Sequence, residues 1–286
     1  MAFEVPIGTL SLGGGDIVIV HNDGDLWLHP GLRDGSPAAP LRLADMGDPR
    51  IPVTEGEGPN TVQDVVGEVG GVVYFSDCCE PVAGDVRAAT GPDMVQRLGY
   101  GWALALSPDR THLASVNFFG YSVWDLTTGT LTSRDVDQTA ALISPRGLRW
   151  SSDGERLIML YVDEQGIWLV PLSASDLLPI AKPTRLDVGF DPQSPPGVQF
   201  AGRGSNGEVA VVYYGNTSTK ISYLDSTTLD EVPGLTRELP AGVTSVRLDS
   251  DGIGLLWVDR NTLWYLPATG PVRRLGHGYT NAWFAT

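Results

Sequence analysis

The sequence predicts a six-bladed β-propeller in which every blade is a four-stranded antiparallel sheet. Three observations support this prediction. Short apolar segments alternate with Gly, Asp and Thr turns along the 286-residue chain, and the pattern repeats. Leu43 and Leu275 occupy equivalent places five repeats apart, which gives a period of about 46 residues. The last segment of the chain has the pattern of a strand that the first repeat lacks.

Each repeat opens with a short apolar strand that ends in a small polar turn. Glycine suits such turns because it tolerates positive φ, and aspartate suits them because its side chain bonds the nearby backbone. The turns follow strands at residues 102–106, 148–150 and 246–248, with weaker copies after 62–66 and 198–200. The three sharpest turns are Ser107–Pro108–Asp109–Arg110, Ser151–Ser152–Asp153–Gly154 and Asp249–Ser250–Asp251–Gly252.

Three further strands complete each repeat. The second is β-branched or aliphatic, and it covers residues 16–20, 72–75, 113–116, 157–162, 209–214 and 254–258. The third has a central aromatic at Trp27, Trp124, Trp168, Tyr223 and Trp264, with Val86 in the second repeat. The fourth carries an Arg-Leu pair at 42–43, 97–98, 185–186 and 274–275.

The two ends of the chain predict how the ring closes. No inner-strand pattern precedes Gly13–Gly14–Gly15, whereas residues 281–286 have that pattern. We therefore expect the C-terminus to supply the innermost strand of blade one, which removes exposed sheet edges. The chain then forms one domain, with blades at about residues 13–48 plus 279–286, 61–98, 101–136, 147–188, 197–239 and 243–275. A β-sandwich followed by a second all-β domain, the alternative, explains neither the period nor the unpaired last strand.

Charge and hydropathy exclude several classes of function. The 34 acidic side chains outnumber the 19 basic ones, which gives a net charge of −15, and the chain has only two lysines. This composition argues against binding nucleic acid or an anionic membrane surface, because both rely on basic side chains. No apolar run approaches the length of about 20 residues that a spanning helix needs, so no membrane insertion is expected. The first six residues lack the basic and apolar parts of a signal peptide.

The turns and the aromatic third strands resemble those of TolB-type β-propellers, whose repeats carry S-P-D-G turns. The resemblance is sharpest in Ser107–Pro108–Asp109–Arg110, in Ser151–Ser152–Asp153–Gly154 and in the sixth blade. Trp124–Asp125 is also similar to the dipeptide of WD repeats, although the Gly-His partner of that motif is absent. The TolB resemblance implies a bacterial protein-interaction scaffold outside the cytoplasm, its export segment absent from this chain. A cytoplasmic location is the alternative.

We expect a binding site over the channel, on the face formed by the links between blades and the loops from second to third strands. Aromatic residues gather on these segments, and exposed aromatics are typical of recognition surfaces. They are Tyr100, Phe118, Phe119, Tyr121, Tyr213, Tyr214 and Tyr279. The alternative interpretation is that they pack between neighbouring blades.

The same face carries carboxylates that could ring the channel, namely Asp23, Asp77, Asp163, Glu164 and Asp259. Clustered carboxylates could hold a cation, attract a basic peptide or act as an acid/base pair. A solvated acidic rim is the alternative. The residues predicted to contact a ligand or partner are Asp77, Tyr100, Phe119, Tyr121, Asp163, Glu164, Tyr214, Asp259, Arg260, His277 and Tyr279.

Cys78 and Cys79 are adjacent and form the most unusual local feature. They could form a vicinal disulfide, which would be strained because neighbouring Cα atoms lie about 3.8 Å apart. The alternative is two reduced thiols that point to opposite faces of a strand.

The sequence contains no H-E-x-x-H, C-x-x-C, Walker or G-x-S-x-G motif, and its four histidines are scattered. We therefore expect no catalytic residues, no metal and no cofactor. The favoured function is a monomeric, non-catalytic scaffold that binds a protein or peptide on its loop-rich face. A hydrolase or lyase that acts on a sugar or lactone with carboxylates at the channel mouth is one alternative, and a small-solute-binding propeller is another.

Overall fold

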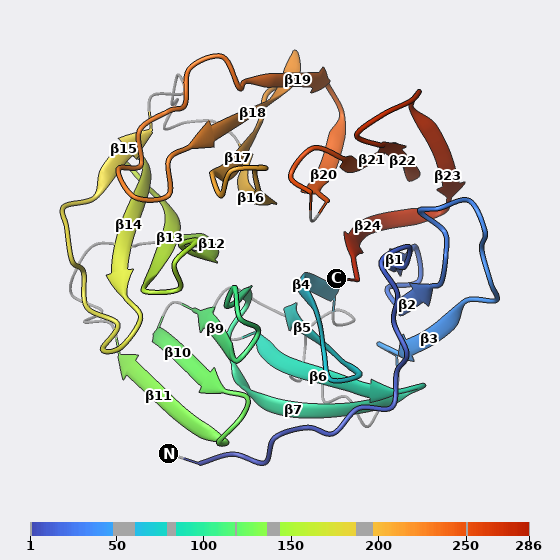
Figure 1. The fold of residues 1–286 in the computed structure, drawn as a ribbon, viewed down its shortest axis with the longest axis horizontal. Helices are drawn as coiled ribbons and strands as arrows, with labels where there is room; N and C mark the ends of the chain where they lie inside the picture. The colour runs from blue at the N-terminus through green and yellow to red at the C-terminus, as the bar shows by residue number, and fades with distance from the viewer. Residues whose placement is uncertain are drawn as a thin grey trace.

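The computed structural model describes residues 2–47, 61–78, 84–117, 119–135, 144–186, 197–249 and 251–285, without the side chains of Cys78 and Ser144. These residues form six four-stranded antiparallel sheets arranged as blades around one axis (Figure 1). The predicted six-bladed propeller is confirmed. No helix in the described part of the chain is long and apolar enough to cross a membrane.

In blades 1 to 6, taken in that order around the ring, the four strands lie at increasing distances from the axis. The innermost strands are β24 (Tyr279–Phe284), β4 (Thr61–Val69), β8 (Ala103–Leu106), β12 (Ser144–Trp150), β16 (Gly197–Arg203) and β20 (Val243–Leu248). The second strands are β1 (Ile17–His21), β5 (Val72–Cys78), β9 (His112–Val116), β13 (Arg156–Asp163), β17 (Val209–Tyr214) and β21 (Leu255–Asp259). The third strands are β2 (Leu26–His29), β6 (Asp85–Gly91), β10 (Gly120–Asp125), β14 (Gly166–Ser173), β18 (Ser218–Leu224) and β22 (Thr262–Leu266). The outermost strands are β3 (Leu41–Ala44), β7 (Met94–Tyr100), β11 (Thr130–Asp135), β15 (Thr184–Leu186), β19 (Arg237–Pro240) and β23 (Arg273–His277).

The C-terminal strand closes the ring as the sequence predicts. β24 pairs antiparallel with β1, and Ile17 lies opposite Phe284 while Ile19 lies opposite Ala282. Each innermost strand contacts the innermost strand of the next blade, and β24 contacts both β20 and β4. Blade 1 is therefore built from both ends of the chain, with its innermost strand supplied by the C-terminus.

Strand alternation explains why the second strands are apolar at nearly every position. Ile17 and Ile19 on β1 pack against blade 6, whereas Val18 and Val20 on the opposite face pack against blade 2. The same holds around the ring, since each of six apolar clusters joins two neighbouring blades. Both faces of every blade are buried, so the sequence shows a continuous apolar run and not an alternating one.

The serine–aspartate turns fold by local hydrogen bonds. Ser107 Oγ donates to Asp109 Oδ1 at 2.6 Å, and that carboxylate also accepts from the Thr111 backbone N–H at 3.1 Å. In blade 6, Gly252 has a φ of 70°, and a Cβ there would lie 2.2 Å from the Ser205 backbone nitrogen of blade 5. Only glycine fits this close approach of two turns, which explains why a glycine ends the motif.

The N-terminal segment has a structural role that the repeat pattern did not predict. The Phe3 N–H donates to the Gly129 carbonyl of blade 3 at 2.8 Å, and the Thr9 N–H donates to the Thr90 carbonyl of blade 2 at 2.8 Å. The segment thus runs along the outside of blades 3 and 2 before it enters blade 1 (Figure 1). It adds hydrogen bonds to blades 2 and 3 and pairs with β11 through one isolated bridge, between Ala2 and Thr130.

Candidate functional site

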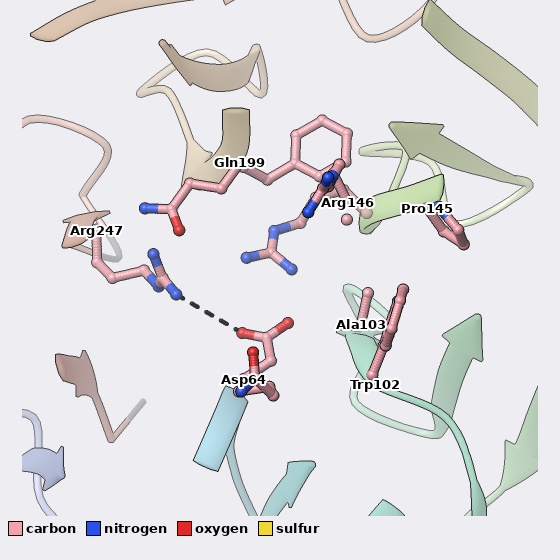
Figure 2. Close-up of a pocket in the computed structure, with 11 residues that line it drawn as sticks. Asp64, Trp102, Ala103, Pro145, Arg146, Gln199 and Arg247 are labelled. Carbon is pink, nitrogen blue, oxygen red and sulfur yellow. Dashed lines mark ion pairs between the residues drawn. The ribbon is translucent and has the colours of Figure 1, made fainter. Parts of the chain in front are cut away.

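The inner strands enclose a cavity of about 170 Å³. Its described lining comes from β4, β8, β12, β16 and β20 and from Trp102 just before β8. The lining contains three arginines but one carboxylate. The charged members are Asp64, Arg146, Arg149 and Arg247. Figure 2 labels Asp64, Arg146 and Arg247 among them. The cavity lining is therefore basic, although the chain as a whole is strongly acidic.

Asp64 and Arg247 face each other across this cavity. Asp64 Oδ1 lies 3.8 Å from Arg247 Nη2, and Figure 2 shows the pair as a dashed line. The carboxylate also accepts hydrogen bonds from the Leu104 N–H at 3.1 Å and from Trp283 Nε1 at 3.3 Å. Arg247 is 7% exposed, and its guanidinium lies 5.1 Å from the centre of the Trp283 ring. The inner strands of blades 2, 1 and 6 are thus joined at one polar contact.

Arg149 enters the cavity from β12. Its Nη1 donates to the carbonyls of Leu104 and Leu148, both at 2.9 Å. Burial lowers the pKa of Arg149; the Asp64 carboxylate opposes that shift, and the neighbouring positive charge of Arg247 adds to it. The guanidinium is held in place by backbone carbonyls and not by a matched carboxylate.

Gln199 is the polar wall of the cavity on β16. The amide orientation that satisfies its neighbours has its oxygen accepting from Arg247 Nη1 at 2.9 Å and from the Val246 N–H at 3.2 Å. Its amide also hydrogen-bonds the hydroxyl of Tyr214, a residue predicted to contact a partner. Burial raises the pKa of the Tyr214 phenol, so this hydroxyl stays protonated and orients Gln199.

None of the five carboxylates predicted to ring the channel is among the described residues that line this cavity. Asp64 is the one carboxylate among the described residues that line the cavity. Asp77 instead lies buried, 2.6 Å from Arg87 Nε, and burial raises the pKa of its carboxyl while Arg87 opposes the shift. The described part of the chain also contains no group of three or more His, Cys, Asp or Glu side chains that could hold a metal ion.

Three predicted aromatics meet in a groove between blades 2 and 3. Tyr100 at the end of β7 is 58% exposed, and Phe119 before β10 is 41% exposed. Tyr121 lines the same groove and also packs against the apolar cluster between blades 3 and 4. The groove has a volume of about 480 Å³, and Trp124 is also part of its lining.

The groove's aromatics are fixed by their surroundings. The Arg97 guanidinium lies 4.4 Å from the centre of the Tyr100 ring, and Arg97 Nε is held at 2.8 Å by Asp85. The Phe119 backbone N–H donates to Asn117 Oδ1 at 2.8 Å, which shapes the turn that presents the ring. An apolar side chain of a partner would meet two preorganised rings here.

The other predicted residues are distributed over separate loops. Asp163 accepts hydrogen bonds from the Gly166 N–H and from Trp168 Nε1, both at 2.9 Å, so it stabilises its own turn beside the exposed Glu164. Arg260 is 90% exposed and lies 3.9 Å from Asp259. His277 is exposed, and its Nδ1 lies 3.2 Å from Thr262 Oγ1.

Tyr279 belongs to a cluster of rings at the junction of blades 6 and 1. Its ring centre lies 5.1 Å from that of His21 and 5.7 Å from that of His29. The two histidines share a contact of 2.9 Å between their Nε2 atoms. Burial, together with the adjacent His21, lowers the pKa of His29 to about 4.

Two predicted features lie outside the described residues. They are Cys79, with the side chain of Cys78, and Phe118. The vicinal disulfide and its alternative, two reduced thiols, therefore both stay predictions.

Sequence reasoning missed the channel arginines, although a signal for them exists. Arg149 and Arg247 each stand two residues before a repeat turn, which begins at Ser151 in one case and Asp249 in the other. Equivalent positions of inner strands face equivalent directions in a propeller. Two arginines at equivalent positions therefore indicate that both side chains face the channel.

Comparisons with known proteins support the fold. No protein-family model matches the chain, and none of the curated proteins matches it in sequence. A chain in the crystal structure of a nidogen/laminin complex is similar with a TM-score of 0.60 and 13% identity, over 93% of this chain and 97% of that one. TolB from Acinetobacter baumannii is similar with a TM-score of 0.58 and 12% identity, over 89% of this chain and 61% of the TolB chain. A protein from Lactobacillus plantarum is similar with a TM-score of 0.54 and 14% identity, over 92% of this chain and 82% of that one. The structural neighbours thus include TolB, and at these identities the likeness supports the propeller fold.

Proposed function

We propose that this chain is a non-catalytic scaffold that binds a protein or peptide at the groove between blades 2 and 3. The observation that carries the proposal is the juxtaposition of Tyr100 and Phe119, both exposed, above a cavity large enough for a side chain. Aromatic anchors of this kind contribute most of the binding energy at protein interfaces. A propeller holds its loops on a rigid frame, so little conformational entropy is lost when they bind.

The rim of the groove suggests how a partner would be oriented. Arg134 and Asp135, both exposed, line the groove beside the aromatics. A charged group on the partner next to its apolar anchor would therefore find a complementary side chain. Polar rims around an apolar centre are usual in interfaces.

The experiment selects peptides from a phage-displayed random library on the immobilised protein. Fluorescence anisotropy then measures the affinity of each selected peptide for the protein. The groove variant Tyr100→Ala/Phe119→Ala is expected to bind selected peptides at least about 10-fold more weakly, as for interface hot spots. The control variant Ile180→Ala/Val272→Ala removes two exposed apolar side chains elsewhere and is expected to bind like the original protein. Equal affinity in all three proteins, or no selected peptide, contradicts the proposal.

We also propose that the chain is a monomeric TolB-type propeller that works outside the cytoplasm. The hydrogen-bonded turns at Ser107 and Ser151 and the likeness to TolB support the family assignment. Sedimentation of the purified chain tests the monomeric state, and a dimer contradicts it. Fractionation of cells that express the natural gene tests the location, and a chain recovered with the cytoplasm contradicts a location outside it.

A further inference from the structure

The channel cavity is a basic site inside an acidic protein. Arg146, Arg149 and Arg247 line it, and Asp64 is the one opposing charge among its described residues. Positive charges that are buried without matched partners cost free energy, so proteins normally pair them or use them. This arrangement requires an explanation beyond packing, because apolar residues would fill an inner strand more cheaply.

The guanidiniums of the buried Arg247 and the partly buried Arg149 retain hydrogen-bonding capacity. Arg247 Nε is buried and has no hydrogen-bond partner among the described residues. The hydrogen bonds of Arg149 within the described structure go through Nη1 to two backbone carbonyls, which carry no net charge. Both guanidiniums are thus positioned, yet neither is matched by a bidentate carboxylate.

Asp64 does not supply that match. Its Oδ2 accepts from the Leu104 N–H, and its Oδ1 accepts from the Val65 N–H and from Trp283 Nε1. Its separation of 3.8 Å from Arg247 Nη2 is longer than a charge-assisted hydrogen bond of about 2.7–2.9 Å. The hydrogen bonds that the Asp64 carboxylate accepts therefore come from uncharged donors of blades 2, 3 and 1.

We propose that the channel cavity binds a small oxyanion, a carboxylate or a phosphate, between Arg149 and Arg247 with Arg146 as a third cation. The forked donors of arginine match the paired oxygens of such anions. At about 30 Å³ per water, the cavity has room for roughly five to six waters, which is enough space for phosphate or a short dicarboxylate. This site goes beyond the proposed groove, since it involves different residues and a different class of ligand.

The test titrates sodium phosphate and, separately, sodium succinate into the intact protein by calorimetry, with sodium chloride holding the ionic strength constant. Saturable binding of at least one anion is expected. Arg149→Gln and Arg247→Gln are each expected to weaken it at least about 10-fold, because each removes a charged hydrogen-bond donor. Arg146→Ala replaces an exposed side chain, so this variant keeps the test valid if a buried substitution fails to fold.

A further variant is expected to strengthen anion binding, in contrast to the arginine variants. Asp64→Asn removes the one carboxylate of the described lining and is expected to strengthen anion binding several-fold. The control Arg260→Gln removes an arginine that is 90% exposed and is expected to bind like the original protein.

The two anions distinguish the source of the oxyanion, since tighter succinate assigns the site to carboxylates and tighter phosphate assigns it to phosphates. No saturable binding of either anion overturns the proposal. Equal binding by Arg146→Ala, Arg149→Gln, Arg247→Gln and the original protein also overturns it. The groove variant Tyr100→Ala/Phe119→Ala should bind the anion normally, so the two sites can fail separately.

Discussion

Trp283 Nε1 donates a hydrogen bond of 3.3 Å to Asp64 Oδ1, which joins the C-terminal strand of blade 1 to the first strand of blade 2. The same indole lies under the Arg247 guanidinium of blade 6. One side chain from the last strand therefore contacts both blades that flank the closure. The ring closes through this contact as well as through the β24–β1 ladder.

Trp283→Ala should destabilise the protein by about 3–5 kcal/mol, since it removes a buried aromatic and leaves a cavity at the closure. Urea denaturation followed by fluorescence and circular dichroism measures the change. Tyr100→Ala, which truncates an exposed ring, is the control and should change stability by less than about 0.5 kcal/mol. Similar effects of the two variants would show that Trp283 does not hold the closure.

Arg87→Ala should cost about 3–5 kcal/mol of stability, because it leaves the buried Asp77 carboxylate without its cation. Arg97→Ala is a matched comparison, since Arg97 also pairs with Asp85 but is 42% exposed in its side chain. It should cost no more than about 1 kcal/mol, as exposed ion pairs do. Chemical denaturation at pH 7 measures the stability lost in each variant. Equal losses would contradict the prediction that the buried ion pair contributes more than the exposed one.

Stability should decrease as pH falls from about 6.5 to about 4 because of His29. Its pKa is about 4 in the folded protein, whereas the ordinary value is 6.5. Protons thus bind the unfolded chain preferentially in this window, so the His29 contribution is complete above pH 6.5 and is lost as pH falls. The loss is at most about 1.4 kcal/mol per pH unit.

The measurement compares denaturation midpoints from pH 7.5 to pH 4 in the original protein and in His29→Gln, which should show a shallower dependence. His277→Gln alters an exposed histidine and should keep the original slope. Parallel curves for the original protein and His29→Gln would contradict the assignment.

Ser107→Ala should raise the pKa of Asp109 from about 2 towards the ordinary value of 3.8. The Ser107 hydroxyl is the largest cause of the depressed pKa, followed by the Thr111 backbone N–H. Carboxyl carbon NMR across a pH titration measures the shift. Ser151→Ala should act in the same direction on Asp153 in the next blade, where Ser151 is again the main cause. An unchanged pKa of Asp109 would show that the Ser107 hydroxyl does not lower that pKa.

The fold could be predicted in detail because its signals are local and repeated. Ser107 and Ser151 mark the same turn in two blades, and Trp124 and Trp168 mark the same strand. Hydrogen bonds within five residues form these turns, so short stretches of sequence carry the information. The N-terminal segment escaped prediction because Phe3 and Thr9 bond to blades distant in sequence and follow no period.

The candidate site was only partly accessible to the same reasoning. Tyr100 and Phe119 were identified as exposed aromatics because loop position predicts exposure. Asp77 was placed on the same surface, but the structure buries it against Arg87, a partner ten residues away. Exposure of a charged loop residue depends on the neighbouring strand, which composition alone does not reveal.

The sequence by itself determined the number of blades, their four strands and the closure by the C-terminal strand, since strand length, turn chemistry and period are written locally along the chain. Only the tertiary structure decided the electrostatics of the axis. Asp64, Arg149 and Arg247 come from three blades and meet because the ring brings its inner strands together. A net charge of −15 describes the average over the chain, whereas the field in a cavity depends on the few charges that surround it.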